Sequence, residues 1–184
     1  MLRGWAWGAP RRGHPEGAVG RHVADLLETI DRWGETDERR EDLRFISLVH
    51  DSLKYAVSPF MLRVGENHHA MRARRFAEGY TNDERLLATI ELHDRPYHLW
   101  RGKRYARWPG RRYRLWRGRR SPNPRAGRGL DGLIPRLPDV ALFVRFVELD
   151  GSTEGKTREP ILWLKEQLEA RGVASSPQPG NGGS

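Results

Sequence analysis

The stretch His50-Asp51-Ser52-Leu53-Lys54 is the most informative pattern in this sequence. His50 and Asp51 are adjacent, so in a helix their side chains point about 100° apart and can both reach one metal ion from a single turn. Lys54 lies one turn further along, on the same side of the helix as His50. Its ammonium group either points into the same pocket or is solvated. Apolar residues around the stretch recur at helical spacing, which predicts a helix over residues 37–57.

Five more helices are predicted on either side of this one, again from the spacing of apolar residues. They cover residues 16–33, 68–79, 81–94, 138–150 and 160–171. Asn67 is expected to cap the helix that follows it, and Thr81 with Glu84 has the pattern of a capping box. Pro96 predicts a helix boundary nearby, and a short helix is expected over residues 130–137. The fold class is therefore all-α, a bundle of about six helices.

The length of 184 residues suits one domain with a sizeable core. We expect an N-terminal lead over residues 1–15, a helical domain over 16–172 and a disordered tail over 173–184, which is rich in Pro, Gly and Ser. No stretch approaches the roughly 18 apolar residues that a membrane span needs, and the start of the chain has no secretion signature. These features predict a cytoplasmic protein with no membrane partner.

Polar residues capable of binding a metal interrupt the apolar faces of five different predicted helices. They are His22, His50, His69, His93 and Asp150. A single buried histidine is usually a hydrogen-bonded core residue, but an ionised carboxylate on an apolar face costs several kcal/mol unless a cation meets it. Because the chain has no cysteine, any metal must be held by His, Asp or Glu. The pattern, completed by Asp51, predicts a metal centre where these faces converge.

The adjacent histidines His68 and His69 require a choice between two faces of one helix. His69 shares its face with Ala73, Phe76 and Ala77, so we assign it as the metal ligand. The face of His68 is more polar and carries Arg72 and Arg75, so these three residues are assigned to substrate binding. Asp94, which follows His93, is expected either to support the metal ligands or to lie at the C-terminal end of the helix. The sequence around His14 and around His98 does not indicate a function for either residue.

The positive charge is concentrated in one segment. The net charge is +9, yet residues 101–128 hold twelve Lys or Arg and no Asp or Glu. Within the insertion at 100–128, an eight-residue repeat begins at Trp100, Trp108 and Trp116, which favours a small β-hairpin or else an irregular basic loop. Its interleaved Trp, Tyr and Arg could stack on bases and contact phosphates. The segment therefore predicts either an anionic partner, such as nucleic acid, or a solvated surface loop.

The ordered set of metal-binding residues resembles the HD-domain superfamily. The matching pattern is His22, then His50-Asp51 with Lys54, then His68-His69, His93 and a late Asp150. This resemblance implies an HD-type helical bundle with one or two divalent ions, iron or manganese in preference to zinc, magnesium or nickel. One ion would take His22, His50, Asp51 and Asp150, and the other would take His69 and His93, with Asp51 bridging.

The same resemblance implies an activity. Most of the family hydrolyse phosphate esters or nucleotides through a metal-activated water, and here Asp51 and Lys54 would be the catalytic residues. A small phosphorylated substrate or a nucleotide is the expected partner. A smaller branch holds two irons and activates oxygen, so a di-iron oxygenase is the alternative within enzymes. A nucleic-acid-binding module built on the basic segment is an alternative of a different class.

Overall fold

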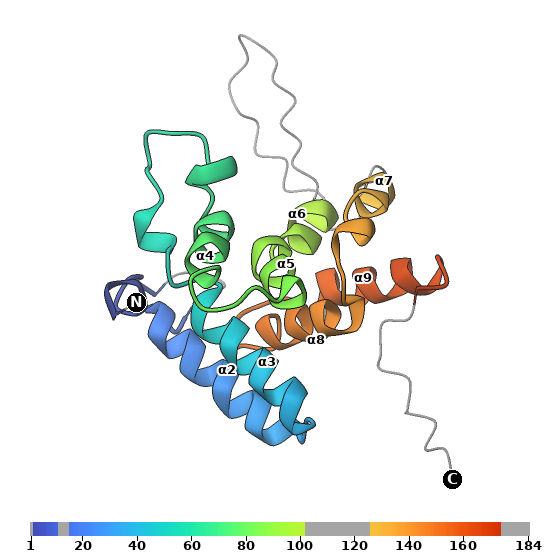
Figure 1. Cartoon of the computed structure of the whole chain (residues 1–184), viewed down its shortest axis with the longest axis horizontal. Coiled ribbons are helices and arrows are strands. Elements are labelled where there is room, and N and C mark those ends of the chain that lie inside the picture. Colours follow the sequence, from blue (N-terminus) through green and yellow to red (C-terminus); the bar gives the residue numbers. More distant parts are fainter. Residues whose placement is uncertain (1, 11–14, 102–125, 174–184) are drawn as a thin grey trace.

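A computed structural model describes residues 2–10, 15–101 and 126–173 of the chain, without the side chains of residues 126–128 (Figure 1). Throughout these residues the regular structure is helical, and no strand occurs among them. The prediction of an all-α fold is confirmed. The predicted hairpin and the nucleic-acid surface fall almost entirely on residues 102–125, which lie outside the described part of the chain.

The six predicted helices are present, and all but the one predicted over residues 37–57 end close to where they were expected. They are α2 (Val19–Trp33), α3 (Asp37–Val49), α4 (His69–Ala77), α5 (Glu84–Leu92), α8 (Val140–Asp150) and α9 (Glu159–Glu169). Helices α2 and α3 pack together as a pair, and α4 and α5 form a second pair beside α3 (Figure 1). Leu26, Ile30, Leu43, Ile46 and Ile90 are completely buried between them. These residues belong to the apolar faces from which the helices were predicted.

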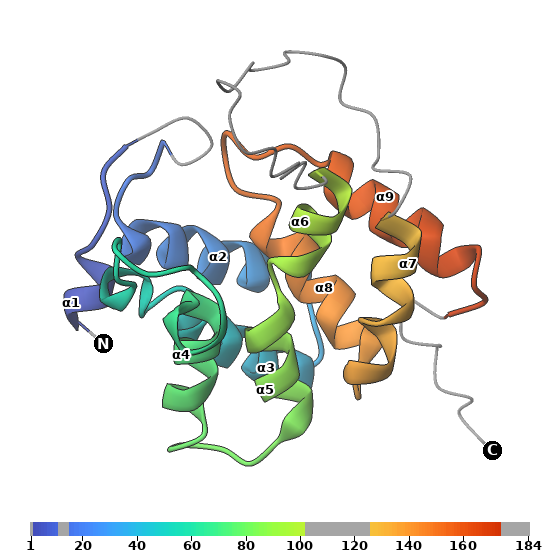
Figure 2. The same cartoon turned by 90° about the horizontal axis from the view of Figure 1, so that it is seen from above.

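Helix α8 is buried on two sides and joins two apolar clusters. Its Leu142, Phe146 and Leu149 belong to the cluster shared with α2 to α5. Its Phe143 and Val144 belong to a second cluster with α9, α6 (Arg95–Arg101) and α7 (Ala126–Asp131). Figure 2 shows α8 lying between these two groups of helices. Residues near the C-terminal end of α8 are thereby held firmly against the ends of α3 and α5.

The predicted helix over residues 37–57 is shorter than expected, because α3 ends at Val49 and a 3₁₀ turn, η1 (Lys54–Ala56), follows. The backbone N–H and the hydroxyl of Ser52 both donate to the carbonyl of Val49, at 3.0 and 2.9 Å. A serine side chain that takes up a carbonyl in this way competes with helix continuation. His50 and Asp51 therefore lie in a tight turn at the end of the helix.

Two predicted caps are wrong. The helix α4 begins after His68, while Asn67 uses its side chain to hold the loop before it, bonding to Ser58, Met61 and Leu62. The helix α5 is capped by Asp83, whose carboxylate accepts from the N–H of Arg85 at 2.8 Å, rather than by the expected capping box. At α4 the expected cap residue bonds to the preceding loop instead of the helix, and at α5 a neighbouring carboxylate takes the place of the expected threonine.

The expected boundary near Pro96 is present, but α6 begins there at once. Pro96 is its second residue, where a missing N–H costs nothing. The short helix expected over residues 130–137 is divided between the end of α7 and the 3₁₀ turn η3 (Ile134–Arg136). In the described ranges, no helix is long and apolar enough to cross a membrane.

The first residues of the chain pack onto the helical body. They form the short helix α1 (Leu2–Trp5), whose Trp5 indole donates to the carbonyl of Leu48 at 3.2 Å. The N–H of Val19, at the start of α2, donates to the carbonyl of Trp7 at 2.9 Å. These contacts bring Trp7 to the turn that carries Asp51.

Candidate metal centre

The six predicted metal ligands lie together, at or near helix ends. His50 and His93 follow the last residues of α3 and α5, Asp150 ends α8, His69 begins α4, and His22 lies in the first turn of α2. Four of them are almost completely buried, with 2% of His22, 0% of His50, 3% of Asp51 and 6% of His93 exposed. The turn after α3 therefore places a cluster of imidazoles and carboxylates within an otherwise apolar interior.

Asp51 lies at the centre of this cluster and faces it with both oxygens. Its Oδ2 atom is 3.4 Å from Nε2 of His50. Its Oδ1 atom is 3.5 Å from Nε2 of His69 and 3.7 Å from Nε2 of His93. Asp51 thus belongs to two groups of three potential ligands, one with His22 and His50 and the other with His69 and His93. In each group, the ligand atoms lie within 4.8 Å of one another.

Asp150 approaches the first of these groups from α8. Its Oδ1 atom is 2.9 Å from Nε2 of His22 and 3.7 Å from Nε2 of His50. His22 and Asp150 are 128 positions apart in the chain. The tertiary structure therefore assembles the predicted set around Asp51, with Asp150 as a further oxygen donor beside His22 and His50.

Backbone carbonyls orient two of the imidazoles toward the centre. The Nδ1 atom of His50 lies 3.0 Å from the carbonyl of Ser47, and Nδ1 of His93 lies 2.8 Å from the carbonyl of Ile90. A ring that donates through Nδ1 to a carbonyl keeps the lone pair of Nε2 for a metal. The ring of Phe146 packs edge-on against His50, with centroids 5.2 Å apart. The imidazoles of His50 and His93 are thus held with their Nε2 atoms facing Asp51.

Two atoms at the centre are buried without a hydrogen bond to any part of the chain that the structure describes. Among the described residues, neither Nε2 of His50 nor Oδ1 of Asp51 has a hydrogen-bond partner. A buried polar atom left in this state costs about 1–3 kcal/mol. A cation bound between them would satisfy both, and imidazole nitrogens with carboxylate oxygens are suitable ligands for iron, zinc or manganese. The residues present therefore fit a divalent metal.

The two carboxylates of the centre are strongly biased toward the charged form. Burial by itself raises the pKa of Asp51, but Lys54 and His50 together hold that pKa well below its usual range. Burial likewise opposes ionisation of Asp150, yet Lys156 and His22 keep its pKa well below the usual value. The centre therefore carries two negative charges that are available to a cation.

The histidines respond differently to the same surroundings. Burial lowers the pKa of His50 and lowers that of His69 to about 3, which keeps both rings neutral and able to coordinate. Burial also acts to lower the pKa of His93, but Asp51 and Asp94 reverse the effect and raise it. The pull of these carboxylates on His93 is the same electrostatic preference for positive charge that would favour a metal ion there.

Two lysines also contact the carboxylates. The ammonium of Lys54 is paired with Oδ2 of Asp51, as its spacing after His50 suggested. Lys156 was not found from the sequence. Its ammonium is 2.7 Å from Oδ1 of Asp150 and 2.9 Å from the carbonyl of the same residue. Lys156 lies in the loop between α8 and α9, where no helical periodicity could place it relative to the predicted metal ligands.

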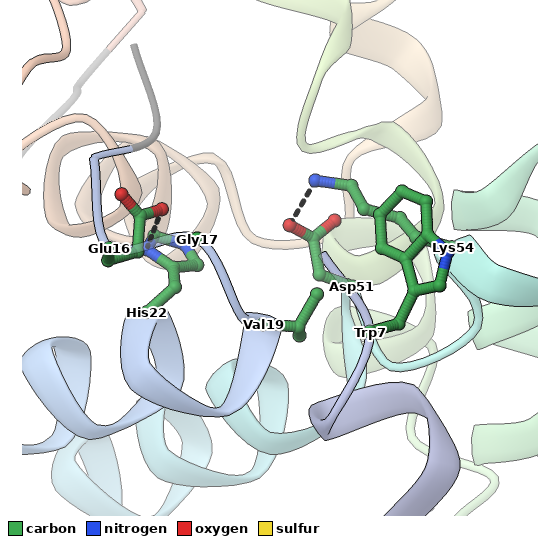
Figure 3. Close-up of a pocket in the computed structure, with 7 residues that line it drawn as sticks. All are labelled: Trp7, Glu16, Gly17, Val19, His22, Asp51 and Lys54. Carbon is green, nitrogen blue, oxygen red and sulfur yellow. Dashed lines mark hydrogen bonds and ion pairs between the residues drawn. The ribbon is translucent and has the colours of Figure 1, made fainter. Parts of the chain in front are cut away.

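A small cavity of about 10 Å³ opens beside the centre (Figure 3). Its lining comes from the turn after α3, the start of α2 and the N-terminal segment. The lining residues are Trp7, Glu16, Gly17, Val19, His22, Asp51 and Lys54. A volume of this order holds a single water or ion rather than a substrate. A larger molecule would therefore meet the centre from outside, next to the indole of Trp7 and the ammonium of Lys54.

The three residues assigned to substrate binding have different positions. His68 is near the centre, stacked on His69 with ring centroids 4.6 Å apart. Arg72 is half-buried in α4, one helical turn after His68, and its Nε atom is buried. The structure does not bring Arg75 to the cluster, because its side chain is 61% exposed and paired with Glu66 and Glu78. The prediction of a substrate contact is retained for His68 and Arg72 only.

The chain thus contains groups of buried histidines and aspartates that are able to hold metal ions. They lie within an all-helical fold and carry the predicted ligands. Comparison of the chain with protein-family models, with curated proteins and with solved structures gives no match. The arrangement of these side chains is accordingly the basis on which a function is inferred.

Proposed function

We propose that this chain is a metal-dependent phosphohydrolase of the HD-domain type, which cleaves a phosphate ester or a nucleotide. The observation that carries the proposal is the position of Asp51 between two groups of ligands. One oxygen of Asp51 faces His50 and the other faces His69 and His93. A carboxylate shared in this way is what a pair of bridged metal ions requires.

The residues divide between the two ions as follows. His22, His50 and Asp51 would hold the first ion, with Asp150 as an additional ligand, and Asp51, His69 and His93 would hold the second. When bound, such a pair supplies a water of lowered pKa and a Lewis acid for the phosphoryl oxygens. Carbonyls of Ser47 and Ile90 fix the rings of His50 and His93, so these ligands are oriented before the substrate arrives.

Two ammonium groups would bind the phosphate. Lys54 and Lys156 each contact a carboxylate of the centre, and both side chains are partly exposed. With a metal bound to the carboxylates, these ammonium groups would be able to turn toward phosphoryl oxygens, where charge-assisted hydrogen bonds are strong. Trp7, which is 40% exposed, and Glu16 form the wall of the cavity on the N-terminal side. They would contact the rest of the substrate.

The test is turnover by the full chain loaded with manganese or iron(II), measured as phosphate release from phosphodiesters, phosphomonoesters and nucleotides. We expect hydrolysis that is abolished in Asp51→Asn. Lys54→Met should reduce kcat/KM by about 10²-fold or more, because it removes a charged hydrogen-bond donor from the site. Lys165→Met, which removes a surface lysine paired with Glu148, is the matched control and should leave turnover unchanged.

No turnover across the whole panel, by protein shown to contain metal, would refute the proposal. Equal losses in Lys54→Met and Lys165→Met would also argue against the assigned role of Lys54, because Lys54 is paired with Asp51 of the centre whereas Lys165 is paired with Glu148. Metal content must be measured on each variant, so that loss of the ions is not mistaken for loss of a catalytic group.

The composition of the ligand set supports a second candidate, a di-iron oxygenase. Four of the six ligands are imidazoles, which suit iron better than they suit magnesium or manganese. Oxygen consumption by the iron-loaded protein, dependent on a polyol or phosphonate and absent with phosphate esters, would favour this function. Phosphate release without oxygen consumption would exclude it.

A further inference from the structure

A third cluster of potential metal ligands lies beside the two groups that share Asp51. It consists of His68, which precedes α4, Asp94, which lies between α5 and α6, and His98 of α6. The Nε2 atoms of His68 and His98 are both 3.2 Å from Oδ2 of Asp94. The sequence pattern indicates no role for His98, and it predicts different roles for His68 and Asp94. The tertiary structure brings all three to one point.

We propose that His68, Asp94 and His98 form a separate binding site for a divalent cation that prefers imidazole, such as zinc or cobalt(II). Two imidazoles and one carboxylate are a donor set that holds such ions while leaving further positions for water or substrate. Asp94 directly precedes α6 and His98 lies four residues further on, one turn into that helix, so one short segment supplies two of the ligands. His68 supplies the third from the position just before α4.

The hydrogen bonding of Asp94 is the strongest support for a cation. Both imidazoles contact Oδ2, whereas Oδ1 is buried with no hydrogen-bond partner among the described residues. A buried polar atom left in this state costs about 1–3 kcal/mol. A cation bound through both oxygens would satisfy this atom.

The third site differs from the other two in its exposure. The side chains of His68 and His98 are 26% and 34% exposed, whereas that of Asp51 is 4% exposed. Ligands at the surface lose more side-chain freedom on binding and compete with water, so the ion is held less tightly and exchanges faster than ions in the interior. The stacking of His68 on His69 nevertheless places this exchangeable ion next to the buried centre.

The test is metal content of the full chain after equilibrium dialysis against cobalt(II), followed by the visible absorption of the bound cobalt. We expect His68→Ala/His98→Ala to bind one ion fewer per chain than the wild type and to lose one component of the cobalt spectrum. The single variant His98→Ala, at the more exposed ligand, should weaken the same component without affecting the fold. Tyr97→Phe is the control on the same helix and should match the wild type.

The outcome is independent of the proposed hydrolase. In Asp51→Asn, which removes the residue common to the buried groups, the exchangeable ion should remain and should then be lost on adding His68→Ala/His98→Ala. If the wild type and His68→Ala/His98→Ala bind equal numbers of ions with equal affinity, and circular dichroism shows both to be folded, the third site is refuted. The cluster would then serve only as a hydrogen-bonded support for His68, and the buried centre would be unaffected.

Discussion

Replacing Asp51 with asparagine should abolish the thermal stabilisation that a divalent ion gives to the buried centre. Asp51 is common to both groups of buried ligands, so the single substitution removes a ligand from each. In the wild type, Nε2 of His50 and Oδ1 of Asp51 are buried without hydrogen bonds in the described structure. At about 1–3 kcal/mol for each atom, binding an ion between them relieves about 2–6 kcal/mol.

The size of the measured effect follows from mass action. An ion at 100 times its dissociation constant stabilises the folded state by about 2.7 kcal/mol, which lies inside the range that the unsatisfied atoms allow. For a chain of this length, each kcal/mol raises Tm by about 2–4 °C. The expected increase on adding metal is therefore about 5–11 °C.

The assay is thermal unfolding followed by circular dichroism, with chelator and with manganese, iron(II) or cobalt(II). The increase in Tm should disappear in Asp51→Asn at ion concentrations that saturate the buried groups but not the more exposed cluster at His98. Asp31→Asn changes an exposed aspartate paired with Arg44 and should keep the full increase. A wild-type Tm that no metal raises, or an increase preserved in Asp51→Asn, would refute the reasoning.

Three further predictions concern the support of the site. Phe146→Ala should destabilise the chain by about 3–5 kcal/mol in urea unfolding and also weaken metal binding, because the ring packs on His50. Phe143→Ala, equally buried but in the second cluster, should show a similar loss of stability with metal affinity unchanged. Gly4→Ala should cost about 1–3 kcal/mol, measured the same way, because its Cβ would lie 1.7 Å from the carbonyl oxygen of Ser52. Asn67→Ala should make the preceding loop a site of early cleavage in limited proteolysis, with helical content unchanged, since that side chain holds the loop through several backbone contacts.

Most of the helices, and the cluster of candidate metal ligands, could be anticipated from the sequence. A helix repeats every 3.6 residues, so the apolar faces that become buried are visible in a window of a few turns. The same faces revealed His22, His50 and His93, because an imidazole among buried leucines and valines is conspicuous in a local pattern. The structure buries all three at the positions that the pattern predicts.

Details that depend on competition between local contacts were less predictable. The sequence favours a continuous helix through Asp51, yet the hydroxyl of Ser52 takes the carbonyl of Val49 and the helix ends. Asn67 suits a helix cap by type, but the loop offers its amide more hydrogen bonds than the helix would. Such alternatives differ by about 1 kcal/mol each, which is too little for residue type alone to decide between them.

Helical spacing in the sequence is enough to identify the polar side chains that interrupt apolar helix faces, and the cost of burying charge shows that the carboxylates among them need charged partners. How these side chains meet is set by the tertiary structure. It alone joined His22 to Asp150 across 128 positions, brought Lys156 to the same carboxylate, and gathered His68 and His98 around Asp94. The physical reason is that periodicity encodes which face of a helix is buried, whereas the partner of that face is determined by the packing of the whole chain.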